Sequence, residues 1–260
     1  MQKGIVSLYG FDEALQAAEI AADIGTAWQC EPTDPVLEPT AANPKSITLD
    51  EDSAKQRLAD FQVPIPPGHT VKSVQHALQS AEKLGYPLVL KALGIAHKTE
   101  TNAVHLNLQS PDTLTNAANE LFGLSDRLYL ESLVEDVIAE LIVGITHDVQ
   151  FGLVMTIGSG GILVEIMQDS HTLVIPATRS QIENLLVELK SAPLFAGYRG
   201  KPKADINAAV DAIMAIQQYA ISESALLLEL DVNPLLLCAE GKGVFAADAL
   251  IVLQEEESNV

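Results

Sequence analysis

Acidic and amide side chains recur at every second position of one leucine-rich stretch, LLLELDVNPLLL (226–237). In an extended strand alternate side chains share a face, so Glu229, Asp231 and Asn233 are predicted to lie together. The opposite, core-facing set is predicted to be Leu228, Leu230 and Val232. Oxygen atoms repeated along such an apolar strand are costly unless something uses them.

The next apolar stretch, GVFAADALIVL, supplies a partner for this face. If the turn centres on Glu240–Gly241, Asn233 lies opposite Asp248 on the neighbouring strand. Such a cluster of oxygen atoms with modest charge suits Mg²⁺, which keeps waters and also binds substrate phosphates. The alternative is an exposed polar face on an edge hairpin.

A second reactive group is His97 in ALGIAHKTETNAV (92–104). A neutral imidazole can attack phosphorus, and a neighbouring carboxylate stabilises the cation that forms. Lys98 and Glu100 could then serve phosphate and imidazole respectively. The alternative is a surface histidine in a polar loop. The other histidines show no mutual spacing suited to a metal: His69, His76, His105, His147 and His171.

Lys91 lies inside the apolar stretch PLVLKAL and must find an anion or reach solvent. A phosphate and a carboxylate are both candidates. The glycines of IGSGGIL (157–163) could let backbone N–H groups approach an anion, but a plain tight turn explains them equally well.

The elements that position these residues alternate between helices and short strands. Asp50 is predicted to cap a helix through Phe61, Gly85 to end a second helix, and Ser110 to cap a third. From residue 127 the pattern is mainly of short β-branched strands divided by turns, which indicates an antiparallel sheet. Two further helices, SQIENLLVELKS and ADINAAVDAIMAIQQYAIS, precede the last strands.

Composition excludes several classes of function. The chain has 260 residues, 48% of them hydrophobic, and a formal net charge of −20. This acidic surface argues against nucleic acid and anionic membranes as partners. Cys30 and Cys238 have no metal-binding spacing, and no signal peptide or membrane-length apolar run is present. These features favour a cytoplasmic protein.

The N-terminal region differs from the rest. Residues 11–25 form an amphipathic helical pattern, and residues 30–46 are a proline-rich linker. The helix is too short to be a domain alone, so residues 1–29 look like the tail of an upstream domain.

Several stretches, in this order, carry a family resemblance. They are LDEDSAKQRLADFQVPIP, YPLVLKALGIAHKTETNAVHLNL, YLESLVEDVIAELIVGITHDVQFG, IGSGGILVEIM, PLFAGYRGKPKADI and LELDVNPLLL…AADALIVL. Over residues 47–254 the chain resembles the ATP-grasp domain of NDP-forming acyl-CoA synthetases, the ADP-forming acetate–CoA ligases. The likeness extends weakly to residues 4–28, which look like the end of the preceding CoA-ligase domain.

The resemblance implies an α+β fold of two ATP-grasp subdomains, residues 47–126 and 127–256, that clasp ATP or ADP with Mg²⁺. It implies phosphoryl transfer through histidine, with His97 as a relay and Asp231 as the acid beside the docked phosphohistidine. It further implies nucleotide contacts from Lys91, Lys98, Glu131 and Leu133 (the adenine hinge) and Glu140 (ribose). Asn233 and Asp248 match the Mg²⁺ positions.

The chain departs from the family pattern at Asn102, where relatives often have glycine, and at Leu250, where many have arginine. The CoA-binding and ligase domains, with the family's other catalytic histidine, are absent. The complete reaction of a small carboxylic acid with CoA is therefore expected to need those domains, on the same protein or on a partner subunit, and the chain is expected to be inactive alone. The match at residues 4–28 favours a piece of a fused enzyme.

Two other functions stay open. One is a non-catalytic, nucleotide-sensing ATP-grasp module of a larger acyl-CoA-linked protein, for which Leu250 and Asn102 would be signs of decay. The other is a carboxylate–amine ligase on the same fold, which is disfavoured because such enzymes do not need the HKTE histidine.

Overall fold

The computed structural model describes residues 10–29, 34–36, 45–94, 103–161, 169–198, 200 and 202–255. The chain divides into two units, residues 1–34 and 35–260. The first contains one helix, α1 (Phe11–Ala27), two residues longer than the predicted segment. Its large apolar side chains Phe11, Leu15, Ile20 and Ile24 are exposed, and so is Trp28, which caps its C-terminal end.

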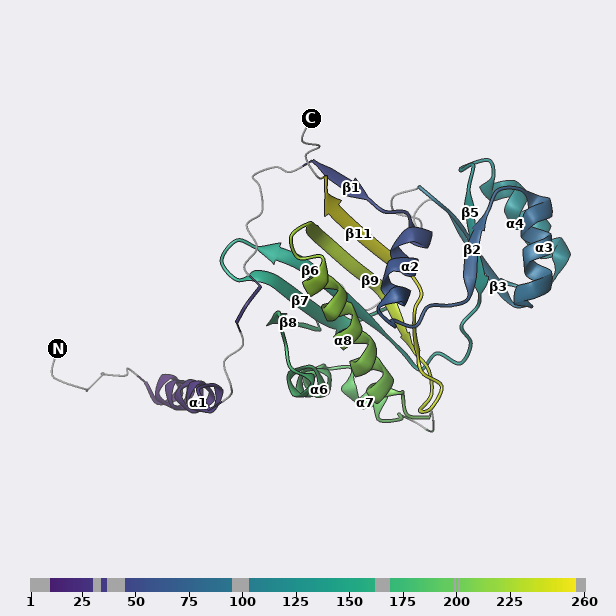
Figure 1. The fold of residues 1–260 in the computed structure, drawn as a ribbon. Coiled ribbons are helices and arrows are strands. Elements are labelled where there is room, and N and C mark those ends of the chain that lie inside the picture. Colours follow the sequence, from purple (N-terminus) through teal and green to yellow (C-terminus); the bar gives the residue numbers. More distant parts are fainter. Residues whose placement is uncertain are drawn as a thin grey trace, which may run out of the picture. The chain divides into compact units, whose positions relative to one another are not determined.

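A seven-stranded sheet forms the larger part of the second unit (Figure 1). Its strands are β1 (Ser46–Thr48), β6 (Ala139–Asp148), β7 (Gly152–Ser159), β8 (Ser170–Val174), β9 (Leu227–Leu237), β10 (Val244–Ala246) and β11 (Ala249–Gln254). The strand order is β1-β11-β9-β6-β7-β8, with β10 also paired to β9. Every one of these pairings is antiparallel, as the short alternating strands predicted.

Helices cover one face of this sheet. They are α2 (Glu51–Asp60), α6 (Arg179–Glu188), α7 (Ala192–Phe195) and α8 (Ile206–Ser222). Helix α8 packs on β9 and β10, and α2 packs on β11. The core between the layers includes Ala54 and Leu58 of α2 together with Ile213 and Ile216 of α8, all fully buried.

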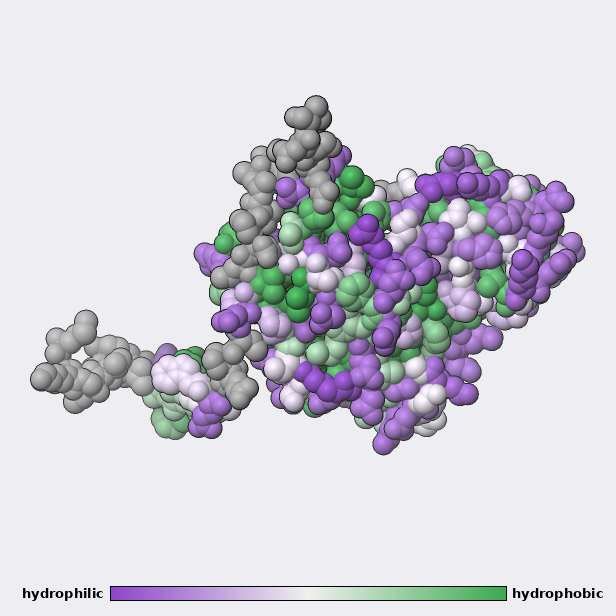
Figure 2. All heavy atoms as spheres, viewed as in Figure 1, coloured by the Kyte–Doolittle hydropathy of each residue, from purple (hydrophilic) through white to green (hydrophobic). Residues whose placement is uncertain are grey.

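A four-stranded antiparallel sheet carries its own core. Its order is β2 (Gly68–Val71), β5 (Leu128–Ser132), β3 (Leu88–Ala92) and β4 (Val104–Leu108). Helices α3 (Val74–Leu84) and α4 (Pro111–Leu121) lie side by side on one face, as Figure 1 shows. In the hydropathy view these two helices present a mainly hydrophilic surface (Figure 2).

The predicted helix ends are confirmed. The Asp50 carboxylate accepts a hydrogen bond from the Ser53 backbone N–H, and Ser110 caps α4 through Thr113. Gly85 ends α3 with a φ of 78°, a conformation that glycine adopts without a steric penalty. Local capping chemistry therefore determines where these helices begin and end.

Two expectations were wrong. The strand at residues 128–132 pairs with β2 and β3 in the smaller sheet, so it does not begin the second subdomain. Leu228 is only half-buried, whereas Leu227 is 1% exposed. The reason is a register shift: Val252 pairs with Glu229 but Leu253 pairs with Leu227, which leaves Leu228 as an extra residue in a β-bulge.

None of the helices in the described part of the chain is long and apolar enough to span a bilayer.

The bulge yields a test of the register. We expect Leu227→Ala to lower the free energy of unfolding by about 2–5 kcal/mol, because it opens a cavity in the larger core. Leu228→Ala is expected to cost less than half as much, since its side chain is already partly solvated. Urea denaturation of the two neighbouring variants measures the difference. If Leu228→Ala lowers the free energy of unfolding more than Leu227→Ala does, then Leu228 faces the core, as strict alternation of side chains along β9 predicts.

Candidate functional site

The predicted hairpin register is confirmed. Ala249 pairs with Val232 and Ala246 with Leu235, so Asn233 lies opposite Asp248. The Asn233 backbone N–H also donates to the Asp248 carbonyl at 3.3 Å. An amide-bearing residue of β9 and a carboxylate-bearing residue of the loop between β10 and β11 are therefore neighbours.

Asp231 lies on β9, two residues before Asn233. Its strand neighbours are Gly144 on β6 and Leu250 on β11. Burial, assisted by the negative charges of Glu229 and Asp248, raises the pKa of Asp231 to about 6. Leu250 occupies the position directly opposite, where an arginine would place a cation, and a leucine does nothing to offset this rise.

Lys91 takes the carboxylate alternative in this structure. Its Nζ donates to Glu51 Oε1, to Glu131 Oε1 and to the Ala247 carbonyl, each at 2.7 Å. An ammonium group has three donors, so these contacts use them all. The Ala247 contact brings Lys91 to the residue before Asp248, and hence beside the predicted metal pair.

A second lysine completes this group of charges. Lys55 Nζ lies 2.9 Å from Glu51 Oε1 and 2.6 Å from Glu131 Oε2, and 4.9 Å from the ring centre of Tyr129. We call Glu51, Lys55, Lys91 and Glu131 the charge cluster. Its side chains are 0–7% exposed, and its two cations balance its two anions.

Pairing overcomes the cost of burial in the charge cluster. Burial alone would lower the pKa of Lys91, but the carboxylates of Glu51 and Glu131, with Asp248 beyond them, hold it above its ordinary value. Lys91 therefore stays charged throughout the physiological range. Its position joins β3 of the smaller sheet to α2 and to Ala247, which both belong with the larger sheet.

Glu131 and Leu133, the predicted adenine hinge, lie at the end of β5. The Glu131 side chain is held in the charge cluster, and the Leu133 backbone N–H donates to the Pro87 carbonyl at 3.0 Å. Leu133 also lines a pocket of about 370 Å³ with apolar walls from Pro66, Pro67 and Phe245. This pocket lies between the hinge and the β9–β10 turn and is of a size to hold a flat heterocycle.

Glu140, the predicted ribose contact, lies on β6 beside Gly160, the residue that follows β7. The Gly160 N–H donates to the Glu140 carbonyl at 2.7 Å. A Cβ added to Gly160 would come within 2.7 Å of Glu140 Cβ, so glycine is needed for this close approach. This hydrogen bond continues the pairing of β6 with β7 by one residue beyond Ser159, so the Gly160 N–H group is already used.

Several predicted residues lie outside the described part of the chain. They are His97, Lys98, Glu100 and Asn102, together with residues 162–163, the end of the stretch IGSGGIL. The described residues on either side of His97 are Gly94, which follows β3, and Ala103, which precedes β4.

Glu51 and Lys55 were missed by the sequence analysis. The signal is in EDSAKQRL, where Glu51 and Lys55 share the helix face of the core residues Ala54 and Leu58. Charged residues on the apolar face of a helix need buried partners, and Glu four residues before Lys is the favourable order for a helical ion pair.

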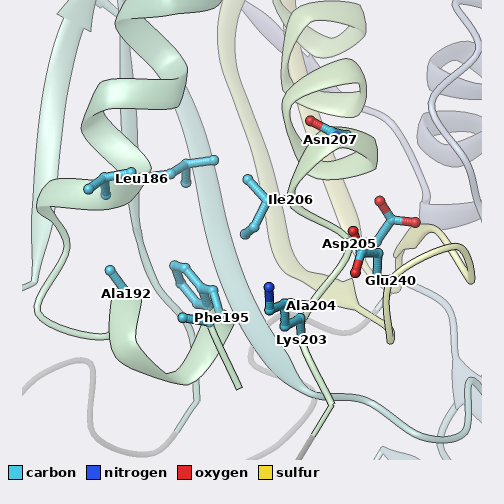
Figure 3. Close-up of a pocket in the computed structure, with 11 residues that line it drawn as sticks. Leu186, Ala192, Phe195, Lys203, Ala204, Asp205, Ile206, Asn207 and Glu240 are labelled. Carbon is cyan, nitrogen blue, oxygen red and sulfur yellow. The ribbon is translucent and has the colours of Figure 1, made fainter. Parts of the chain in front are cut away.

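Another pocket, of about 290 Å³, lies among α6, α7 and the start of α8. Leu186, Phe195 and Ile206 converge on it, and Lys203, Asp205 and Glu240 lie toward the β9–β10 turn (Figure 3). The Asp205 carboxylate accepts from the N–H groups of Ala208, Gly241 and Gly243. Within the described residues, none of the predicted site residues lines this pocket, so it is separate from the site.

Comparison with known proteins identifies the family of this chain. Residues 40–253 match the model of the ATP-grasp domain family. The β subunit of the ADP-forming acetate–CoA ligase II of Pyrococcus furiosus is 31% identical over 229 residues, which cover 84% of this chain and 97% of that one. The ADP-forming acetate–CoA ligase of Methanocaldococcus jannaschii is 33% identical over 84% of this chain. This chain spans only 32% of that enzyme.

Solved structures show the same relationship. An acetyl-coenzyme A synthetase of Candidatus Korarchaeum cryptofilum, in complex with coenzyme A and Ca-AMPCP, has a TM-score of 0.74 at 28% identity. The match covers 80% of this chain and 93% of that one. Another structure of that enzyme holds Mg-AMPPCP, with a phosphohistidine segment pointing towards the nucleotide-binding site. The chain belongs to the ATP-grasp family, on the branch of the ADP-forming acetate–CoA ligases. The predicted fold is confirmed.

The residues present fit Mg²⁺. Asn233 and Asp248 offer the amide and carboxylate oxygens that this ion prefers, at a place open to a polyphosphate. Among the residues that the structure describes, no three His, Cys, Asp or Glu side chains are grouped to hold a metal by themselves.

The raised pKa of Asp231 predicts that this residue lowers the free energy of unfolding more at high pH than at low pH. Because the folded chain binds this proton more tightly than the unfolded chain, the stabilisation is complete below the ordinary value of 3.8 and is lost as the pH rises through about 6. Asp231→Asn should therefore raise the free energy of unfolding at about pH 8 by on the order of 1 kcal/mol, allowing for screening, and by much less at about pH 4.

Urea denaturation at the two pH values measures this, with Asp211→Asn on the exposed side of α8 as the control. An equal effect of Asp231→Asn at both pH values would show that burial does not perturb this carboxyl.

Proposed function

We propose that this chain is the nucleotide-binding half of an ADP-forming acyl-CoA synthetase. The observation that carries the proposal is the juxtaposition of Lys91, through Ala247, with the Asn233–Asp248 pair. A cation and an oxygen-ligand pair at one place suit a Mg²⁺-bound polyphosphate. Relatives that match most of this chain are named as ligases that form ADP, and one was solved with Mg-AMPPCP.

In the proposed reaction, a histidine nitrogen takes the phosphoryl group of an acyl phosphate, and the carboxylate leaves. The N–P bond then breaks as an oxygen of the β-phosphate of ADP forms the new O–P bond of ATP. Asn233 and Asp248 would hold Mg²⁺, which neutralises charge on the phosphates. Lys91 would keep a positive charge beside them, and Glu140 and the hinge at Leu133 would orient ribose and adenine.

Two roles concern the transfer itself. We assign the histidine relay to His97, supported by Lys98, and we assign to Asp231 the contact with the docked phosphohistidine. An Asp231 pKa of about 6 leaves this carboxyl able to change protonation near neutral pH. It can therefore accept a proton from, or return one to, an imidazole that lies against it.

The acyl and CoA substrates belong to domains beyond this chain. We propose that residues 1–29 are the tail of a CoA-ligase domain, because α1 exposes Phe11, Ile20 and Trp28, which a packed helix would bury. The chain spans about a third of its single-chain relatives, which are named for acetate, 4-hydroxybutyrate and feruloyl substrates. Acyl specificity is therefore assigned to the partner domains.

Binding of Mg-ADP tests the nucleotide role. We expect calorimetry to detect Mg-ADP at micromolar to millimolar concentrations, and Asp248→Asn to weaken binding about tenfold or more because the ion loses a charged ligand. Adenosine affinity should stay unchanged. Asp211→Asn, which removes an equal charge from the exposed side of α8, is the control. Absence of Mg-ADP binding to the wild type at millimolar concentration would refute the proposal.

Phosphohistidine formation tests the relay. The chain is mixed with the CoA-ligase domains of a relative and with acyl phosphate that carries a labelled phosphoryl group. We expect the chain to acquire a label that is labile in acid and stable in base, as a phosphohistidine is. His97→Ala should lower the label on this chain to background, whereas His147→Ala, at the far end of β6, should not change it. Equal labelling of the His97→Ala variant would remove His97 from the relay.

A further inference from the structure

The charge cluster contains two residues of α2 that the proposed reaction does not use. Lys91 and Glu131 are placed by the small sheet, but Glu51 and Lys55 come from a helix packed on the larger sheet. All four carboxylate–ammonium distances lie between 2.6 and 2.9 Å. Such contacts need a function, because a well-packed apolar group is often no less stable than a buried ion pair.

The two lysines differ in what they can reach. Lys55 is 0% exposed and its contacts are Glu51, Glu131 and the face of Tyr129. Lys91 also contacts Ala247, next to Asp248. Glu51 Oε1 accepts from both ammonium groups, so it links the enclosed lysine to the one beside the metal pair.

Without Lys55, the negative charge of the two carboxylates would exceed the positive charge of Lys91. Glu51, Glu131 and Lys91 sum to one negative charge, which would repel a polyphosphate. Adding Lys55 makes the sum zero, and the interaction of charges a few ångströms apart in a poorly solvated region is substantial. The cation of Lys91 is then available to attract phosphate, although both carboxylates hold it in place.

We propose that Glu51 and Lys55 are positioning residues of the nucleotide site: Glu51 orients the Lys91 ammonium group toward the Ala247–Asp248 segment, and Lys55 neutralises the carboxylate that this requires. The inference rests on the proposed function, because it assigns the phosphates of the nucleotide to the neighbourhood of Lys91. When they bind, the uncharged Ala247 carbonyl is the partner that Lys91 exchanges most readily, because the hydrogen bonds of Lys91 to the two charged carboxylates are stronger.

The test uses variants that shift the cluster by one charge in opposite directions. Lys55→Met leaves one excess negative charge and should weaken Mg-ADP binding about three- to tenfold. Glu51→Gln keeps the shape and a carbonyl acceptor but leaves one excess positive charge, and it should strengthen binding to a similar degree. The double variant restores neutrality and should bind within about twofold of the wild type.

Two controls separate this role from a structural one. Adenosine, which has no phosphate, should bind all variants equally, and circular dichroism reports whether each variant is folded. If Lys55→Met does not fold, Glu51→Gln still decides the question, because a merely structural role predicts weaker binding. Arg179→Met, which removes an exposed cation of α6, should leave Mg-ADP affinity unchanged.

The outcomes distinguish the two proposals. Opposite shifts with Mg-ADP, and none with adenosine, support the inference. If the wild type binds Mg-ADP but Glu51→Gln and Lys55→Met weaken it alike, or leave it unchanged, the positioning role is wrong and the proposed function stands. Failure of the wild type to bind Mg-ADP overturns the proposed function and the inference with it.

Discussion

The arrangement of this protein depends on one constraint, the free-energy cost of removing charged side chains from water. Four ionised side chains meet where the two sheets approach, and each is tolerable there only because opposite charges surround it. The geometry of the group therefore specifies how α2, β3 and β5 come together. A hydrophobic contact would allow some sliding, whereas paired ions at hydrogen-bond distance do not.

The same constraint organises the acidic face of β9. Asp231, Asn233 and Asp248 crowd oxygen atoms on one side, and the only described cation close by, Lys91, is already committed to two carboxylates. The face therefore favours incoming positive charge, either a divalent ion or a proton. The proposed reaction needs both a metal-bound polyphosphate and a proton acceptor near a phosphohistidine, and the electrostatics of this face suit both.

The sequence predicted the features that residues close together in the chain determine, namely the helix ends and the register of the hairpin. Capping residues located α2, α3 and α4, and the short β9–β10 turn set the register that brings Asn233 opposite Asp248. The sheet to which β5 belongs was not predictable, because an antiparallel strand has the same alternation in either sheet. The bulge at Leu228 could not be predicted because residues 226–228 are all leucine. Whichever of them faces the core, the pattern of apolar residues is the same. The two carboxylate partners of Lys91 lie 40 residues before and after it, beyond the range of periodicity.

The pairing of β1 with β11 has a consequence for how the chain folds. Ser46 is opposite Gln254, so the larger sheet closes only when its last strand is available. The smaller sheet needs nothing beyond residue 132. During synthesis it can be complete while β1 and α2 still lack the strand on which they pack, and contacts of such sequence separation form slowly. Folding of this protein is thus expected to finish from its C-terminal end, with the charge cluster assembled last.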